Sequence, residues 1–221
     1  MLHIVNKNVH VFGRGKVTLT RDVPRNAPLA THEAPLDPLA YRICAVTSST
    51  ATLDGIIFRQ AGRMVAPLVS SRSDCCLYIW NSCARVQHCE VHSQAYGIVL
   101  QGGKQADWTG PDFYSGPLRR PRMETRPPVS AIVSCLVRAF GAAISLDLGA
   151  LGAVTDNDVT SISSIAIVIT DVDPRLVVDR NVIHGPAFLV TEDALQGVVG
   201  EDNEQLSDEV DEEGCHYYDY M

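Results

Sequence analysis

Short runs of alternating apolar and polar residues recur along the chain, each followed by a corner of Gly, Asn, Asp or Ser and a second short run. Four pairs of runs are clear: residues 89–92 and 96–100, 135–138 and 142–146, 157–160 and 165–169, and 180–183 and 186–190. Equivalent apolar markers in the first runs, at Val91, Val137, Val159 and Ile183, are separated by sequence intervals of 46, 22 and 24. Small residues in the second runs, at Gly97, Ala143, Ala166 and Ala187, are separated by intervals of 46, 23 and 21. Two independent markers therefore indicate one short repeat, about 21 to 24 residues long. The interval of 46 spans two repeats or one repeat with a long insertion.

The first hundred residues show the same pattern at wider spacing. Runs near Val11, Leu53 and Val86 lie at intervals of 42 and 33, so insertions must fill the difference. Three candidate insertions are the proline-rich segments 21–40 and 102–128 and the polar segment 61–74. Proline removes a backbone donor and is excluded from central strands, so these segments are expected to leave the corners as loops. Residues 13–16, Gly-Arg-Gly-Lys, lack the spacing of a phosphate-binding loop and predict a tight turn between two strands.

The β-branched alternation predicts an all-β fold. The period of the repeat predicts that residues 1–200 form a right-handed, single-stranded parallel β-helix, which is a solenoid, with long loop insertions. In such a stack each strand pairs with its equivalent one repeat away, and corner side chains such as Asn157 and Asn181 are expected to stack. The first run begins almost at residue 1, which predicts an uncovered strand edge. We interpret this as part of a longer solenoid or as a first coil that docks on a partner.

Charge is concentrated at one end of the 221-residue sequence. The formal charge is −8, and residues 201–221 contain nine acidic residues and no Lys or Arg, so the remainder is close to neutral at +1. We expect residues 201–221 to form a disordered acidic tail. A near-neutral body gives no reason to expect nucleic-acid binding. The sequence has neither an apolar stretch of about 20 residues nor a signal peptide, which predicts a cytoplasmic protein with no membrane contact.

The seven cysteines are expected to be free thiols, mostly buried among aliphatic neighbours. Their odd number and the lack of a secretory signal argue against a disulfide framework. Cys75, Cys76, Cys83, His88, Cys89 and His92 could suggest a metal site, but their spacing matches no zinc motif. We therefore expect no metal and no cofactor.

Two groups of motifs resemble a known family. Ala-Thr-Leu-Asp-Gly-Ile-Ile-Phe at 51–58, and Cys-Glu-Val-His-Ser at 89–93 followed by Gly-Ile-Val-Leu-Gln-Gly-Gly at 97–103, look like repeats of pectin-lyase-like right-handed β-helix proteins. The intracellular branch is most similar, namely the β-helix regions of F-box-only substrate adaptors and of Shc SH2-domain-binding proteins. The resemblance covers roughly residues 2–200 and implies a fold. The sequence shows no F-box helices, so it does not extend to ubiquitin-ligase adaptor activity.

The segment 102–128 combines aromatic and arginine side chains, the types enriched at binding hot spots. Candidate binding residues are Trp108, Phe113, Tyr114, Arg119, Arg120 and Arg122. Lys104 and Arg126 lie in the same segment, on which the acidic tail could dock. We expect a non-catalytic scaffold with a protein partner.

The alternative is a carbohydrate-binding or carbohydrate-active β-helix protein, such as a polysaccharide lyase or glycoside hydrolase. Such an enzyme needs convergent carboxylates. The candidates are Asp156, Asp158, Asp171 and Asp173, with Arg175 and Arg180 nearby. The same aspartates also suit tight corners, and no catalytic residue is assigned from the sequence.

Overall fold

The computed structural model describes residues 1–22, 42–61, 75–103, 128–162, 165–185, 188–190 and 197–206. These residues form an all-β fold of 18 strands without a helix. Every strand pairing found among them is parallel. The described part of the chain has no helix that is long and apolar enough to cross a membrane.

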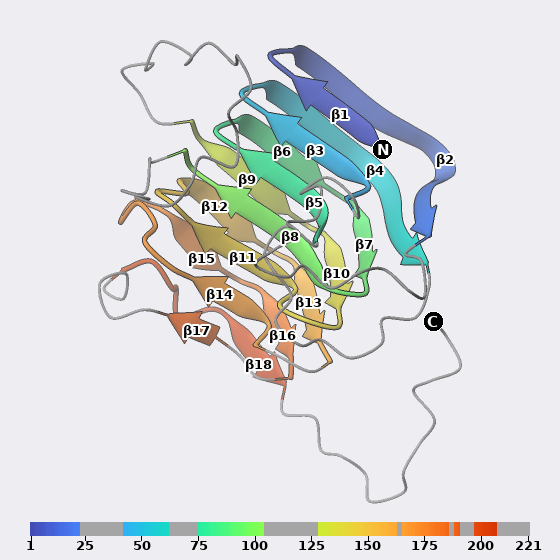
Figure 1. Cartoon of the computed structure of the whole chain (residues 1–221). Helices are drawn as coiled ribbons and strands as arrows, with labels where there is room; N and C mark the ends of the chain where they lie inside the picture. The colour runs from blue at the N-terminus through green and yellow to red at the C-terminus, as the bar shows by residue number, and fades with distance from the viewer. Residues whose placement is uncertain are drawn as a thin grey trace, which may run out of the picture.

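One sheet has seven strands in the order β1-β3-β5-β8-β11-β14-β17. Their bounds are β1 Leu2–Val5, β3 Cys44–Thr47, β5 Cys75–Trp80, β8 Tyr96–Gln101, β11 Ile144–Asp147, β14 Ile167–Ile169 and β17 Phe188–Val190. Figure 1 shows these strands stacked from the N-terminal end to the C-terminal end of the molecule.

The second sheet has eleven strands and curls behind the first (Figure 1). Its strands are β2 Asn8–Asp22, β4 Thr50–Ala61, β6 Cys83–Gln87, β7 Glu90–Ser93, β9 Ser130–Val133, β10 Leu136–Ala139, β12 Gly152–Thr155, β13 Asp158–Ser161, β15 Val177–Asp179, β16 Val182–His184 and β18 Glu204–Leu206. The long strand β4 divides this sheet into two branches. Residues 50–54 of β4 pair with β6, and residues 57–59 pair with β7. Both halves of β4 also pair with β2.

The register confirms the repeat predicted from the apolar markers. Val137 lies opposite Val91 on one side and Val159 on the other, and Val159 lies opposite Ile183. The earlier markers align in the same way, because Val11 pairs with Leu53 and Leu53 with Val86. Repeats of different length therefore place their apolar residues in continuous columns.

The segment 13–16 is a bulge and not the predicted tight turn. Strand β2 continues through it, with Phe12 opposite Asp54 and Val17 opposite Ile56. Four residues of β2 thus face the single residue Gly55, and the extra residues bend the strand without reversing it. Gly55 has a φ of +65°, and a Cβ on Gly13 would collide with its carbonyl oxygen. The two glycines permit this close approach of the two backbones.

The core consists of apolar columns enclosed by the two sheets. Its largest fully buried side chains include Phe58, Leu53, Ile98, Ile144 and Ile167. Each such side chain contributes about 1.5–3 kcal/mol through removal of apolar surface from water. Among the described cysteines, Cys44, Cys75, Cys76, Cys89 and Cys135 are buried free thiols, as predicted, whereas Cys83 is exposed.

The corners use a repeated local geometry. In the second sheet each corner residue has a positive φ, and the members are Gly55, His88, Ser134, Asp156 and Arg180. After each of the last four of these corners the next residue is buried and donates to the carbonyl oxygen of the preceding repeat, and the half-buried Asn203 does the same in the last layer. Those residues are Cys89, Cys135, Asn157, Asn181 and Asn203, with acceptors Leu53, Val86, Ile132, Val154 and Val178.

The asparagines of this column also bond one another, as predicted for Asn157 and Asn181. Asn157 Nδ2 donates to Asn181 Oδ1 at 2.8 Å, and Asn181 Nδ2 donates to Asn203 Oδ1 at 2.9 Å. Asn203 and β18 lie beyond residue 200, so the stacked strands extend past the predicted start of the acidic tail. Residues 207–221 lie outside the described residues, as do most of the predicted insertions.

Candidate interaction surface

The binding residues predicted in segment 102–128 lie outside the described residues. They are Trp108, Phe113, Tyr114, Arg119, Arg120 and Arg122. The acidic stretch 207–221 lies outside them as well, so its docking on the arginines of segment 102–128 stays a prediction.

The four aspartates considered for catalysis lie at two different corners. Asp156 and Asp158 flank Asn157 between β12 and β13, whereas Asp171 and Asp173 follow β14. Asp156 accepts two hydrogen bonds from Arg180, at 2.8 and 2.9 Å, and these hold the pKa of its carboxyl below the usual range.

Two of the other aspartates also have basic neighbours close by. Asp158 Oδ1 lies 3.3 Å from His184 Nε2. Asp173 accepts one hydrogen bond from the backbone N–H of Arg175 and two from its guanidinium. Asp171 has a φ of +45°, as a corner residue does. The placement of all four follows from corner geometry and local ion pairing.

A row of polar side chains crosses the outer face of the second sheet. We call it the basic column, and its members are Thr20, Arg59, His92, Arg138, Thr160 and His184. Alternation places it there, because each member from β4 onward follows a buried residue of the core, such as Phe58, Val91 or Val137. Neighbouring strands are about 4.8 Å apart, so six members span about 24 Å across the sheet.

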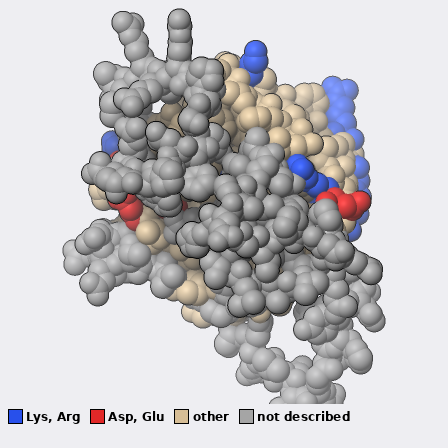
Figure 2. All heavy atoms as spheres, in the orientation of Figure 1, with Lys and Arg blue, Asp and Glu red and all other residues tan. Residues whose placement is uncertain are grey.

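Arg59 and Arg138 are exposed and lie on either side of His92. Neither guanidinium has an ion pair or a hydrogen bond among the described residues. Figure 2 shows basic side chains gathered along the edge where β2 and β4 lie in Figure 1. The two arginines are two strands apart, about 10 Å, so their mutual repulsion is weak and is screened by salt, and an anion bound between them would interact with both.

His92 responds to this environment. Burial lowers its pKa, and the charges of Arg59 and Arg138 lower it further, whereas the neighbouring carboxylate of Glu90 opposes the shift. Glu90 Oε2 lies 3.5 Å from His92 Nε2. The centre of the basic column therefore holds a histidine biased toward its neutral form between two arginines.

A second polar group lies on the other branch of the same sheet, but its members satisfy one another. Gln87 Nε2 donates to Asp54 Oδ2 at 2.9 Å, and His88 Nδ1 lies 3.0 Å from Asp54 Oδ1. Arg85 donates to the Gln87 side-chain oxygen. The bond with His88, followed by that with Gln87, holds the pKa of Asp54 below its usual range. This closed network presents less unmatched charge than the basic column.

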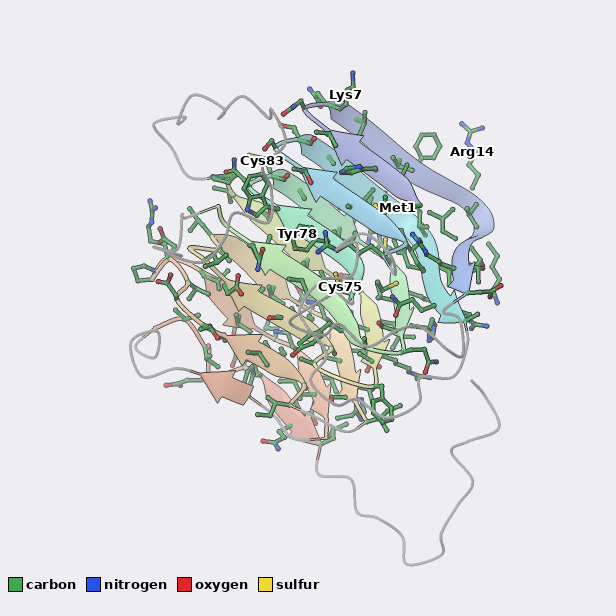
Figure 3. The ribbon with its side chains drawn as sticks, viewed as in Figure 1. Met1, Lys7, Arg14, Cys75, Tyr78 and Cys83 are labelled. Carbon is green, nitrogen blue, oxygen red and sulfur yellow. The ribbon has the colours of Figure 1, made fainter. Side chains whose placement is uncertain are left out.

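The outer face of the first sheet holds a polar row that is largely withdrawn from water. Tyr78 lies on β5 (Figure 3). The Arg42 guanidinium lies 3.7 Å from the centroid of the Tyr78 ring. Tyr78 donates to Gln101 Oε1 at 2.6 Å, and Gln101 Nε2 donates to Asp147 Oδ2 at 3.4 Å. Arg42 is 3% exposed and Asp147 is 1% exposed. The row therefore links neighbouring strands and exposes little polar surface to which a ligand could bind.

The described cysteines and histidines do not form a metal centre. No group of three or more His, Cys, Asp or Glu side chains within the described ranges is arranged to hold an ion. Cys44 illustrates the thiol environment, because burial raises its pKa to about 12. Burial also raises the pKa of Cys76 well above the usual range. Such thiols are protonated and weakly nucleophilic at neutral pH.

The basic column was missed in the sequence, although its signal was present. Four of its members directly follow the marker residues: His92 follows Val91, Arg138 follows Val137, Thr160 follows Val159 and His184 follows Ile183. The marker alignment thus also aligns the outward positions. Arg59 was hidden because its run precedes a long insertion.

Comparison of the sequence with models of protein families, with curated proteins and with solved structures found no match in any of the three.

Proposed function

We propose that the chain is a non-catalytic interaction scaffold built on a right-handed parallel β-helix, and that its basic column binds an extended acidic segment of a protein partner. The β-helix is supported by the parallel pairing of equivalent strands in successive repeats. The right hand is supported by the strong preference of parallel crossover connections for that hand.

One observation carries the binding role. Two exposed arginines are held within about 10 Å of each other on a regular sheet face, with no carboxylate paired to either among the described residues. A scaffold of stacked strands fixes these positions in advance, so little entropy is lost when an anionic chain binds across them. Thr20 and Thr160 add hydroxyl groups at the two ends of the arginine pair.

The neighbouring column favours a peptide as the ligand. It contains Glu90, Leu136, Asp158 and Val182, which alternate acidic and apolar side chains beside the basic column. Neither column holds a Trp, Tyr or Phe ring on which a sugar face could pack. An extended peptide with alternating acidic and apolar residues can place carboxylates near Arg59 and Arg138 and apolar side chains against Leu136 and Val182, since successive side chains point to opposite sides. Glu90 and Asp158 lie beside the histidines of the basic column, which leaves its two arginines as the sites for ligand carboxylates.

The test measures binding of a fluorescein-labelled peptide of alternating Glu and Leu by fluorescence anisotropy. We compare the intact chain with the double variant Arg59→Gln/Arg138→Gln. Two exposed charge contacts contribute about 1.5 kcal/mol together, so the double variant is expected to bind about tenfold more weakly. Raised salt is expected to weaken binding to the intact chain more than to the variant.

The matched control is Arg85→Gln/Arg175→Gln, which removes two exposed arginines outside the basic column. It is expected to bind the peptide like the intact chain. Circular dichroism and urea unfolding confirm that each variant is folded. Equal binding by both double variants, or no binding by the intact chain, would refute the proposal.

A parallel titration with oligogalacturonate separates the two ligand classes. Tighter binding of the sugar acid than of the peptide, lost in Arg59→Gln/Arg138→Gln, would replace the protein partner by an acidic carbohydrate. Release of reducing ends from that ligand would replace the scaffold by an enzyme.

A further inference from the structure

Among the described residues, the apolar core is open at both ends of the stack. Six apolar residues that pack on the core are only partly buried: Leu2, Val9, Val11, Leu19, Phe188 and Val199. All six lie in the first or the last layer of strands. We call these layers the N-terminal layer, which is β1 and β2, and the C-terminal layer, which is β17, Val199 and β18.

The exposed ends belong to the same columns. Following the pairs from strand to strand, Leu2 begins the column that ends at Phe188. Val11 begins the column that ends at Val199. A layer placed on either end in continued register would therefore set apolar side chains against apolar side chains.

Strand edges are open at the same two ends. Among the described residues, β1 pairs with β3 alone and β2 with β4 alone, while β17 pairs with β14 alone and β18 with β16 alone. All these strands run in one direction, so a second copy stacked by translation would continue the parallel ladder. Stacking two identical ends would reverse the strand direction and break that continuity.

The two ends carry opposite charge. The N-terminal layer and its linking turn contain one carboxylate, Asp22, and four cationic side chains: Lys7, Arg14, Lys16 and Arg21. Figure 3 shows Lys7 and Arg14 projecting outward from this layer. The C-terminal layer and the residues that join Val199 to β18 have no Lys or Arg, and their carboxylates are Glu201, Asp202 and Glu204. Charge thus favours contact between unlike ends and opposes contact between like ends.

We propose that copies of this chain associate head to tail, with the C-terminal layer of one copy stacked on the N-terminal layer of the next. Leu2 then faces Phe188 of the neighbouring copy, and Val11 faces its Val199. Because the two surfaces in contact are different, the interface is heterologous and each added copy exposes a new end. The assembly grows without closing at a dimer. This proposal does not depend on the ligand of the basic column.

Sedimentation velocity over a range of concentrations tests the association. The intact chain is expected to show an average mass that rises past the mass of a dimer without a plateau, and to return toward the mass of one copy in high salt. The double variant Arg14→Glu/Lys16→Glu is expected to weaken association at least about tenfold, since it places acidic side chains at both ends. The control Arg85→Glu/Arg175→Glu makes the same change of charge at two exposed arginines outside both the terminal layers and the basic column, and is expected to leave association unchanged.

Cysteine cross-linking tests the register. Thr20 and Leu206 end the same outward column, so head-to-tail stacking brings them to the separation of neighbouring strands, within reach of a disulfide. A mixture of Thr20→Cys and Leu206→Cys chains, both with Cys83→Ser and Cys215→Ser, is expected to form a mixed dimer on mild oxidation. Thr20→Cys mixed with Val177→Cys is the control, because Val177 is exposed on the other branch.

Each result decides the proposal. A single-copy mass at all concentrations would overturn it, as would association that is equal in the two double variants. Cross-linking of Thr20→Cys to itself in preference to Leu206→Cys would show contact between like ends and would also overturn it. Three results together establish it: an average mass that rises with concentration, weaker association in Arg14→Glu/Lys16→Glu, and selective cross-linking of Thr20→Cys to Leu206→Cys.

Discussion

The side chain of Asn181 is fully buried and joins three successive layers. Its Nδ2 donates to the carbonyl oxygen of Val154 at 2.9 Å and to Asn203 Oδ1 at 2.9 Å. Its Oδ1 accepts from the backbone N–H of Asn157 at 3.1 Å and from Asn157 Nδ2 at 2.8 Å. The change Asn181→Ala removes these four contacts, and also the bond from Nδ2 to the carbonyl oxygen of Asp179 at 3.1 Å, at a site that is 0% exposed.

The cost follows from the groups that lose a partner. The Asn157 N–H and side-chain amide and the Val154 carbonyl are buried, and each unsatisfied polar group costs about 1 kcal/mol or more. We therefore expect Asn181→Ala to lower the free energy of unfolding by about 3 kcal/mol. The small cavity left by the shortened side chain acts in the same direction.

Urea unfolding followed by circular dichroism measures this loss. Asn203→Ala is the matched control, because Asn203 makes equivalent bonds in the last layer but is only partly buried. Water replaces its lost contacts, so we expect a loss of about 1 kcal/mol. Equal losses in the two variants, or a loss below about 1 kcal/mol in Asn181→Ala, would refute the argument from buried hydrogen bonds.

Gly152, His92 and Cys83 each test a different feature of the stack. Gly152→Ala is expected to lower the free energy of unfolding in urea by more than about 3 kcal/mol. The φ of Gly152 is +138°, and a Cβ there would overlap the carbonyl oxygen of Ser130 on β9. The control Gly15→Ala, at φ +75° with no atom within 4 Å of the added Cβ, is expected to lower it by about 1 kcal/mol. The pKa of His92 is expected to rise in Arg59→Gln, as measured by NMR titration, and an unchanged pKa would contradict the assigned influence of Arg59. Because the pKa of His92 is lowered in the folded state, the unfolded chain takes up the proton first as the pH falls. This histidine therefore reduces the stability of the fold as the pH falls through the ordinary histidine range. Among the described thiols, Cys83 is expected to react with iodoacetamide far faster than the others, as mapped by mass spectrometry, and equal labelling of buried thiols in the native protein would argue against the described core.

The sequence was sufficient to predict the parallel stack and much of its register. Val91, Val137 and Val159 fall in one column because each lies at the same distance from a corner. The stacking of Asn157 on Asn181 was predictable for the same reason. Asn203 was missed because the acidic residues around it suggested a solvated tail.

The remaining errors have physical causes. A Gly-x-Gly segment can form a turn or a bulge, and the choice at residues 13–16 depends on Gly55, which is distant in sequence. The basic column joins side chains such as Arg59 and His92 from different repeats, separated by a long insertion. Single-residue patterns locate the faces of strands, but the charges that gather on a face depend on the register between repeats.

The preserved register also bears on how this chain can change over evolutionary time. The short repeat from Val137 to Val159 and the much longer interval from Val91 to Val137 align their apolar columns equally well, because the added residues fall between the strands β8 and β9. Segments can therefore lengthen, shorten or be exchanged there without turning buried side chains outward. Removing the unit between two equivalent positions, such as Val137 and Val159, would leave the outer strands able to pair across the deletion. The residues between strands can therefore change in length and sequence while the buried columns stay the same, so that the chain can acquire new surfaces and keep the underlying stack.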